Sequence, residues 1–154
     1  MKLILVSKTN EKWISEGIEK FYNRIKHYHT LEIITVNDKN KGKTEPEICK
    51  KSEGELILSR IKEKDFVCLL DENGTHFTSI KFSEWLNKEL FLNNRPIVFV
   101  IGGAFGFSPA VYSRANCQIS LSAMTCSHQV IRLFFMEQLY RAFTILNNEP
   151  YHHT

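Results

Sequence analysis

The sequence predicts an α/β fold in one domain, residues 1–154, in which a mostly parallel sheet is flanked by helices. Segments typical of strands and of helices alternate from one end of the chain to the other, which is the pattern of parallel sheets. Residues 97–101 form an unbroken, mostly β-branched apolar run, as in a strand buried on both faces. At 154 residues, 43% of them hydrophobic, the chain is long enough to bury a full core.

Local signals place the elements in order. We expect strands at 2–7, 31–36, 66–70, 97–101 and 118–121, and helices at 11–26, 46–62, 83–92, from 108 onward, and at 128–146. The first helix follows from apolar residues that recur every three or four positions, namely Ile14, Ile18, Phe21 and Ile25. Pro46 suits the first turn of the second helix.

Turn and capping residues mark the middle of the chain. Asn73-Gly74 is typical of a turn after the strand at 66–70. Ser83 is a favoured N-cap for the third helix, and Ser108-Pro109 combines a cap with a first-turn proline. The polar, lysine-rich segment 38–45 is the expected mobile loop.

The last helix is apolar around nearly its whole circumference. One stripe holds Ile131, Phe134, Phe135, Gln138, Ala142 and Ile145, and most of the remaining surface holds Val130, Leu133, Met136, Leu139, Tyr140 and Phe143. A helix of this kind is buried on two sides. Its own sheet can cover one side, so we expect a homodimer that covers the other.

Composition narrows the class of protein. The net charge of +3 is too small to identify a nucleic-acid-binding protein by itself. Four cysteines without a C-x-x-C pair indicate free thiols in a reducing compartment and no metal site. No apolar run approaches the ~20 residues that span a bilayer. The N-terminus lacks a cleavable signal, so we expect a cytoplasmic protein with no membrane partner.

Several common motifs are missing. A glycine loop, 102–106, follows a strand, but Ile101 stands where the dinucleotide fingerprint needs glycine, and no acidic residue lies between this loop and Glu137. Neither a Walker loop nor a G-x-S-x-G elbow is present. Cys126 and His128 stand two residues apart at the start of the last helix, where a small packing cysteine is a better interpretation than a thiol nucleophile.

Two loops of small residues, 102–106 and 120–127, remain as a candidate ligand site, because open α/β sheets bind ligands at the carboxyl ends of their strands. Neither loop has an acidic side chain, which favours a nucleoside held by main-chain hydrogen bonds over a metal. Residues that favour an RNA substrate follow closely: Arg132, Tyr140, Arg141, Tyr151 and His152. Arg141 can also pair with Glu137 four residues earlier. Both a nucleoside-cofactor enzyme and an RNA-binding domain stay open at this point.

The segments VFVIGGAFGFS, 98–108, and SLSAMTCSHQVIRLFFMEQLYRAFTILNNEPYHH, 120–153, resemble the RlmH family of SPOUT methyltransferases. The resemblance covers the whole chain. It implies a SPOUT-type α/β knot with a C-terminal trefoil knot, a homodimer through the C-terminal helix, and S-adenosylmethionine as cofactor. It further implies methylation of N3 of a pseudouridine in 23S ribosomal RNA of the assembled ribosome, with no DNA partner.

The same resemblance implies roles for individual residues. The family's cofactor pocket maps onto Leu70, Gly103, Ser122, Ala123, Met124, Thr125, Cys126 and Ser127. For the chemistry, His152 is the candidate base and Arg141 the candidate that stabilises the developing anion, with Tyr151 and Tyr140 positioning the target base. His128 can serve in either role or simply begin the helix.

Two departures and two alternatives accompany this interpretation. Family members often have proline where this chain has Ser127, which bears on the rigidity of the loop, and Lys or Arg where it has His153, which predicts a weaker, pH-dependent phosphate contact. One alternative is a non-catalytic ribosome-binding or RNA-binding module with the same fold. The other is a SPOUT enzyme acting on transfer RNA, although the short chain has no room for the added RNA-binding domain common in such enzymes.

Overall fold

The computed structural model describes residues 1–37, 45–92 and 95–152. Most of the expected mobile loop and His153 therefore lie outside the described residues. The helices and strands follow the predicted alternation: β1 Lys2–Val6, α1 Lys12–Ile25, β2 Glu32–Val36, α2 Pro46–Leu58, β3 Phe66–His76, α3 Ser79–Asn87, a π-helical turn Lys88–Leu92, β4 Ile97–Ile101, α4 Pro109–Arg114, β5 Cys117–Ser120 and α5 Val130–Leu146.

The strands form one five-stranded sheet in the order β2-β1-β4-β3-β5. Every neighbouring pair runs parallel, so the predicted α/β class is confirmed and the sheet is parallel throughout. β4 lies in the middle, and all five of its residues are buried, as the apolar run at 97–101 predicted. Because all strands run in one direction, their carboxyl ends meet at one edge of the sheet.

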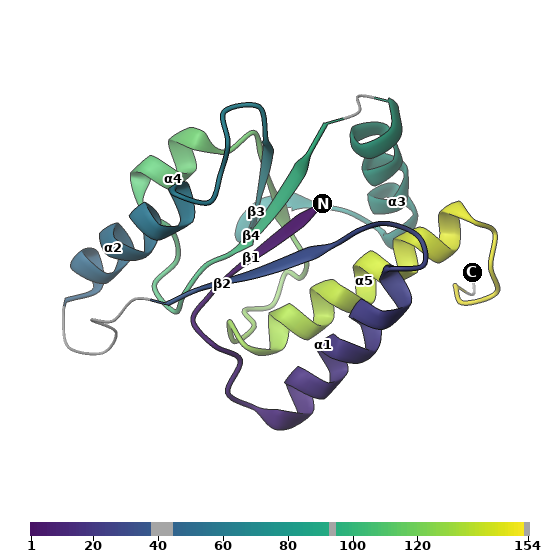
Figure 1. Cartoon of the computed structure of the whole chain (residues 1–154), viewed down its shortest axis with the longest axis horizontal. Helices are drawn as coiled ribbons and strands as arrows, with labels where there is room; N and C mark the ends of the chain where they lie inside the picture. Colours follow the sequence, from purple (N-terminus) through teal and green to yellow (C-terminus); the bar gives the residue numbers. More distant parts are fainter. Residues whose placement is uncertain (38–44, 93–94, 153–154) are drawn as a thin grey trace.

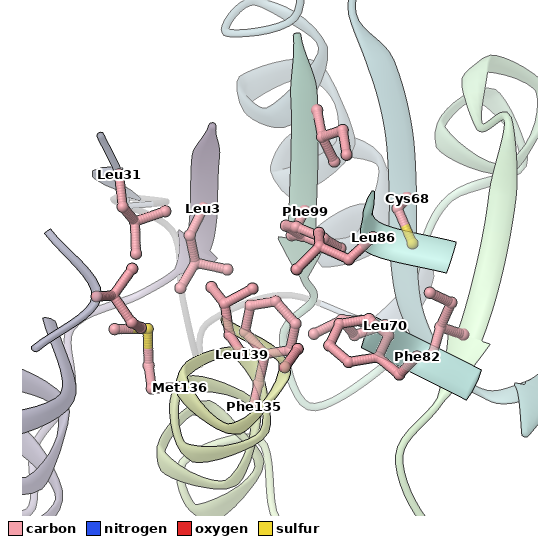
Figure 2. Close-up of a cluster of buried hydrophobic side chains, with 14 of the residues drawn as sticks. Leu3, Leu31, Cys68, Leu70, Phe82, Leu86, Phe99, Phe135, Met136 and Leu139 are labelled. Atoms are coloured by element: carbon pink, nitrogen blue, oxygen red, sulfur yellow. The ribbon is translucent and has the colours of Figure 1, made fainter. Parts of the chain in front are cut away.

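Helices cover both faces of the sheet. α2 and α4 lie on one face, and α1, α3 and α5 lie on the other (Figure 1). Figure 2 shows the larger core, in which Phe135 and Leu139 of α5 lie below Leu3 and Phe99 of the sheet. The rings of Phe99 and Phe135 are 4.8 Å apart. Burial of alternate strand residues on opposite faces therefore holds both helical layers to the sheet.

α5 lies between α1 and α3 and is buried on more than one side, as its apolar circumference predicted. A Cβ on Gly17 of α1 would lie 2.7 Å from the Leu133 side chain, so the glycine allows the two helices to approach closely. Part of the helix stays uncovered, because Val130 is 40% and Phe134 is 37% exposed. The neighbouring helices thus cover part of the surface that the homodimer was expected to cover.

The turn predicted at Asn73-Gly74 is wrong, because β3 continues through both residues to His76. The pairing of β3 with β5 shifts register between Leu70 and Thr75. At this shift a Cβ on Gly74 would lie 2.6 Å from the backbone of β5. The glycine therefore serves the close approach of two strands rather than a chain reversal.

The predicted start of the third helix is also wrong. α3 begins at Ser79, and its N-cap is Thr78, whose hydroxyl accepts a hydrogen bond from the Lys81 backbone N–H at 3.2 Å. Ser83 lies inside the helix, is 1% exposed, and donates its hydroxyl hydrogen bond to the carbonyl of Ile80. Two other helices are shorter than expected, with α2 ending at Leu58 and α5 beginning at Val130. Ser108 precedes α4, but its side chain makes no capping hydrogen bond.

Candidate active site

A cavity of about 570 Å³ lies at the carboxyl ends of β3, β4 and β5. Its walls come from residues 70–73 in the middle of β3, the glycine loop that follows β4, and the small-residue loop that follows β5. These are the two loops that the sequence predicted to meet. The volume falls in the range of roughly 300–1,000 Å³ that is usual for cofactor and small-ligand sites.

The glycine loop reaches the cavity in a fixed shape. Gly103 and Gly106 form an isolated bridge, in which the Gly106 N–H donates to the Gly103 carbonyl at 3.3 Å. Gly106 has φ +79°, a conformation that a side chain rarely adopts. Behind the loop lies Glu53 of α2, since a Cβ on Gly103 would lie 2.5 Å from one of its carboxylate oxygens. Gly54, which follows Glu53 in α2, is packed as tightly against the side chain of Ser108. α2 therefore supports this loop from the side away from the cavity.

Internal hydrogen bonds hold the loop after β5. The Ser120 hydroxyl donates to the Ser122 carbonyl at 2.9 Å, and the Met124 N–H donates to the Ser122 hydroxyl at 2.9 Å. The Ser127 hydroxyl accepts from the Val130 N–H at 3.2 Å, which joins the loop to the start of α5. The side chains of the loop thus form hydrogen bonds with its own backbone and with the start of α5.

Most residues expected to hold a cofactor line this cavity. They are Leu70, Gly103, Ser122, Met124, Thr125, Cys126 and Ser127, together with His128. Ala123 lies in the same loop but is not among the lining residues, so its predicted contact is not supported. Met124 is 79% exposed, which leaves its side chain at the open side of the cavity. The prediction of free cysteines is confirmed, since Cys126 and the other three cysteines form no disulfide.

Neither of the two loops has an acidic side chain, but β3 adds two carboxylates to the cavity that the sequence analysis did not expect. Asp71 and Glu72, which directly follow Leu70 in β3, both line the cavity. The Tyr112 hydroxyl donates to Asp71 at 2.6 Å, and the Thr125 hydroxyl lies 3.4 Å from Glu72. Burial, followed by the hydrogen bond to Asp71, raises the pKa of Tyr112 to about 12, so Tyr112 stays a hydrogen-bond donor at neutral pH. Their position at the end of a buried strand was the signal that could have identified these carboxylates.

Three of the four predicted catalytic residues form a cluster at the other end of α5. Arg141 donates through Nε and Nη2 to Glu137 Oε1, at 3.1 and 2.6 Å, as the four-residue spacing suggested. The Tyr151 hydroxyl donates to the same oxygen at 3.0 Å, and Arg141 Nη1 lies 3.4 Å from His152 Nδ1. The Arg141 guanidinium also stacks over the Tyr151 ring at 4.8 Å. We call Glu137, Arg141, Tyr151 and His152 the tail cluster.

The tail cluster and the cavity are separate within one chain. Ile131, in the first turn of α5, lines the cavity, whereas no member of the tail cluster does. Arg141 follows Ile131 by ten residues, which corresponds to roughly 15 Å along a helix. His128 is the one predicted catalytic residue at the cavity. Its ring Nε2 lies 3.0 Å from Gln129 Nε2.

Arg132, a candidate RNA contact from sequence, is buried completely. Its guanidinium donates to the carbonyls of Val6 and Ser7 at 2.6 and 3.0 Å, and to the Thr9 hydroxyl at 2.9 Å. Ser7 has φ +69°, so this arginine fastens a backbone turn in the left-handed region to the start of α5. The role of Arg132 is therefore structural.

The described residues contain no candidate metal site and no candidate membrane span. Within 1–37, 45–92 and 95–152, no group of three His, Cys, Asp or Glu side chains could hold a metal ion. In the same part of the chain, no helix is long and apolar enough to cross a membrane.

The family model and three relatives that match this chain are all described as methyltransferases. Residues 1–152 match the family model described as "Predicted SPOUT methyltransferase". Relatives named "Ribosomal RNA large subunit methyltransferase H" include one from Christiangramia forsetii, 51% identical over 99% of this chain and 98% of the relative. Another, from Parabacteroides distasonis, is 49% identical over 98% and 97%. A third, from Cytophaga hutchinsonii, is 42% identical over 99% of both.

These matches extend over nearly the full length of the chain and of its relatives, so they cover both the cavity and the tail cluster. SPOUT methyltransferases use S-adenosylmethionine, and the family implies the C-terminal trefoil knot that the resemblance led us to expect. The chain belongs to the SPOUT methyltransferase family and, within it, to the RlmH family.

Proposed function

We propose that this protein is a cytoplasmic enzyme that transfers a methyl group from S-adenosylmethionine to N3 of a pseudouridine in 23S ribosomal RNA of the assembled ribosome. The names of the full-length relatives support the substrate class. The observation that carries the proposal is the 570 Å³ cavity at the carboxyl edge of the sheet, where the glycine loop and the loop after β5 meet.

The lining residues fit this cofactor. Leu70, Ile101 and Ile119 offer apolar surface for an adenine ring, and the glycines let main-chain groups come close to it. Asp71 and Glu72 provide acceptors for a positively charged amino group. The residues at the cavity therefore match a ligand that combines an aromatic base, a ribose and a cationic end.

Catalysis would depend mainly on alignment. The bound cofactor supplies a methyl group on a positively charged sulfur, which makes that methyl electrophilic. The two loops would hold the cofactor, and correct orientation of the attacking nitrogen would lower the barrier. His128 stands at the cavity, where it can contact either the cofactor or the incoming base.

The tail cluster would handle the proton and the charge. His152 is the proposed acceptor of the N3 proton, and the Arg141 guanidinium would stabilise the anion that forms. Burial and then the Glu137 carboxylate raise the pKa of Tyr151, so this phenol stays protonated. Tyr151 therefore acts as a hydrogen-bond donor that positions the base rather than as the proton acceptor.

The separation of the tail cluster from the cavity supports a homodimer through α5. In a two-fold dimer with antiparallel α5 helices, the C-terminal half of one helix lies beside the N-terminal half of the other. The exposed Val130 and Phe134 side chains are in that N-terminal half. Such a dimer would bring the tail cluster of one subunit to the cavity of the other.

The activity is tested by incubating the purified protein with labelled S-adenosylmethionine and pseudouridylated ribosomes. We expect one methyl group on one pseudouridine, and loss of transfer in Arg141→Ala and His152→Ala. Calorimetry with the cofactor separates an enzyme from a non-catalytic RNA-binding module, because a pure binding module has no need of the cofactor. Label that is absent from the ribosome, or appears on transfer RNA instead, would contradict the proposal.

The dimer is tested by light scattering and by complementation. Two differently tagged variants, Gly103→Ala in the cavity and Arg141→Ala in the tail cluster, are co-expressed and the mixed dimer is purified. If the sites are shared, the mixed dimer keeps one intact site and about half of the wild-type activity, while neither parent dimer has an intact site. An inactive mixed dimer, or a monomer in light scattering, would contradict the shared site.

A further inference from the structure

Arg24, in the last turn of α1, lies beside the tail cluster but has no carboxylate partner among the residues that the structure describes. Its guanidinium carbon is 5.3 Å from the centre of the Tyr140 ring and 5.9 Å from that of Phe21. Within the described residues it makes no ion pair and no side-chain hydrogen bond. Two aromatic rings therefore hold the guanidinium in place, and no described residue accepts a hydrogen bond from its N–H groups.

Tyr140 connects Arg24 to the tail cluster. Its ring packs edge-on against Tyr151 at 4.8 Å and lies 5.9 Å from Phe21. The charge of Arg24 also acts on Tyr151, whose pKa it lowers slightly against the larger raising effects. Arg24 and the tail cluster thus form one continuous surface of arginines and aromatic rings, contributed by two helices and the chain terminus.

The two arginines of this surface differ in charge compensation. Glu137 binds two nitrogens of Arg141 and accepts a hydrogen bond from Tyr151, so its carboxylate offsets the charge of Arg141. Arg24 has no such partner among the described residues. In the described part of this surface, the positive charge of Arg24 is therefore the one that remains available to an anion that approaches it. Because guanidinium groups bind phosphate oxygens through two parallel N–H donors, the chemistry favours a phosphodiester.

We propose that Arg24 binds a backbone phosphate of the RNA whose target nucleotide reaches the tail cluster. The inference rests on the proposed function and adds a positioning contact to it. Tyr140 and Phe21 order the guanidinium in advance, so little side-chain entropy is lost when the phosphate binds. The contact fixes the register of the RNA on the enzyme and carries no sequence information of its own.

The test is the affinity for purified 70S ribosomes at a series of KCl concentrations, with Arg24→Gln, Arg24→Lys and the control Arg60→Ala. Arg60 is exposed and lies beyond α2 on the opposite face, so its removal causes the same loss of charge elsewhere. For Arg24→Gln we expect a roughly tenfold weaker affinity and a salt slope reduced by about 0.7–0.9. Arg24→Lys keeps most of the slope, and Arg60→Ala matches the wild type. The apparent KM for ribosomes rises in Arg24→Gln while kcat and cofactor affinity stay unchanged.

Unchanged ribosome affinity and salt slope in Arg24→Gln would overturn the phosphate contact. Equal losses in Arg24→Gln and Arg24→Lys, together with lower melting temperatures, would also overturn it, because they would assign Arg24 to α1–α5 packing alone. The measurement of ribosome affinity does not depend on methyl transfer. A wild-type protein that binds ribosomes with the Arg24-dependent slope but transfers no methyl group would therefore contradict the proposed function and leave the phosphate contact standing.

Discussion

Substitution of Gly103 by alanine tests how α2 shapes the cavity. The new Cβ would lie 2.5 and 2.8 Å from the two carboxylate oxygens of Glu53, and 3.0 Å from the carbon between them. Glu53 is 5% exposed, so its carboxylate has little room to move away. The glycine loop must then shift toward the cavity.

The magnitude follows from packing. Forcing an extra methyl group into a close-packed site costs about 1–3 kcal/mol. For a chain of this length, that corresponds to a fall in melting temperature of roughly 2–4 °C per kcal/mol. Because Gly103 lines the cavity, the displaced loop also weakens cofactor binding. If the strain is relieved in the free protein but about 1.4 kcal/mol of it returns when the cofactor binds, the affinity falls about tenfold.

Calorimetry with S-adenosylmethionine and thermal unfolding measure both effects, and Glu53→Ala supplies the decisive comparison. In the double variant Gly103→Ala/Glu53→Ala the clash is absent. We therefore expect the double variant to be about 1–2 kcal/mol more stable than the sum of the two single losses predicts. Gly106→Ala is the matched control, since nothing lies within 4 Å of its Cβ position and its cost comes from φ +79°, which Glu53→Ala cannot relieve. Wild-type affinity in Gly103→Ala, or additive losses in the double variant, would refute the reasoning.

Three further predictions concern stability. Arg132→Met leaves the carbonyls of Val6 and Ser7 without their donor, so urea unfolding should show a loss of about 2–5 kcal/mol; a loss below 1 kcal/mol would contradict the structural role. Thr78→Ala removes the N-cap of α3 and should lower the free energy of unfolding by about 1 kcal/mol. In Ser83→Ala, hydrogen exchange should show the same protection of the first turn of α3 as in the wild type. Tyr112 has a folded pKa raised to about 12 from 10, so its contribution to stability is complete below pH 10 and is lost as the pH rises toward 12. Tyr112→Phe should lack that part of the alkaline loss, and equal alkaline profiles for both proteins would contradict the part-buried hydrogen bond to Asp71.

The apolar parts of the strands were predictable because a short apolar run has few other physical solutions, whereas the polar second half of β3 was not. Ile97–Ile101 is buried along its whole length, and its bounds agree with the prediction. Gly74 shows what local reasoning misses. Its neighbour Asn73 makes the pair look like a turn, but the glycine is required by the β5 backbone, more than forty residues later in the chain.

The two loops of the cavity were predictable for a similar reason, since small residues at the carboxyl end of a strand have a known use. The contribution of Asp71 and Glu72 was missed because the strand was expected to end at Leu70, with a turn directly after it, whereas β3 continues to His76. Arg132 could not be assigned from its own helix, because the carbonyls that it binds belong to β1 and the residue after it. Which residues of the chain meet at a site depends on the order of strands, and that order is not a local property of the sequence.

The most direct test of the central claim is a titration of the purified protein with S-adenosylmethionine, followed by mapping of the methylated ribosomal RNA. We predict binding at one cavity per chain, roughly tenfold weaker binding in Gly103→Ala, and a single new methyl group at N3 of one pseudouridine of the large subunit. A protein that binds no cofactor, or that binds it equally well when the glycine loop is blocked, would contradict the claim that this cavity is the active site.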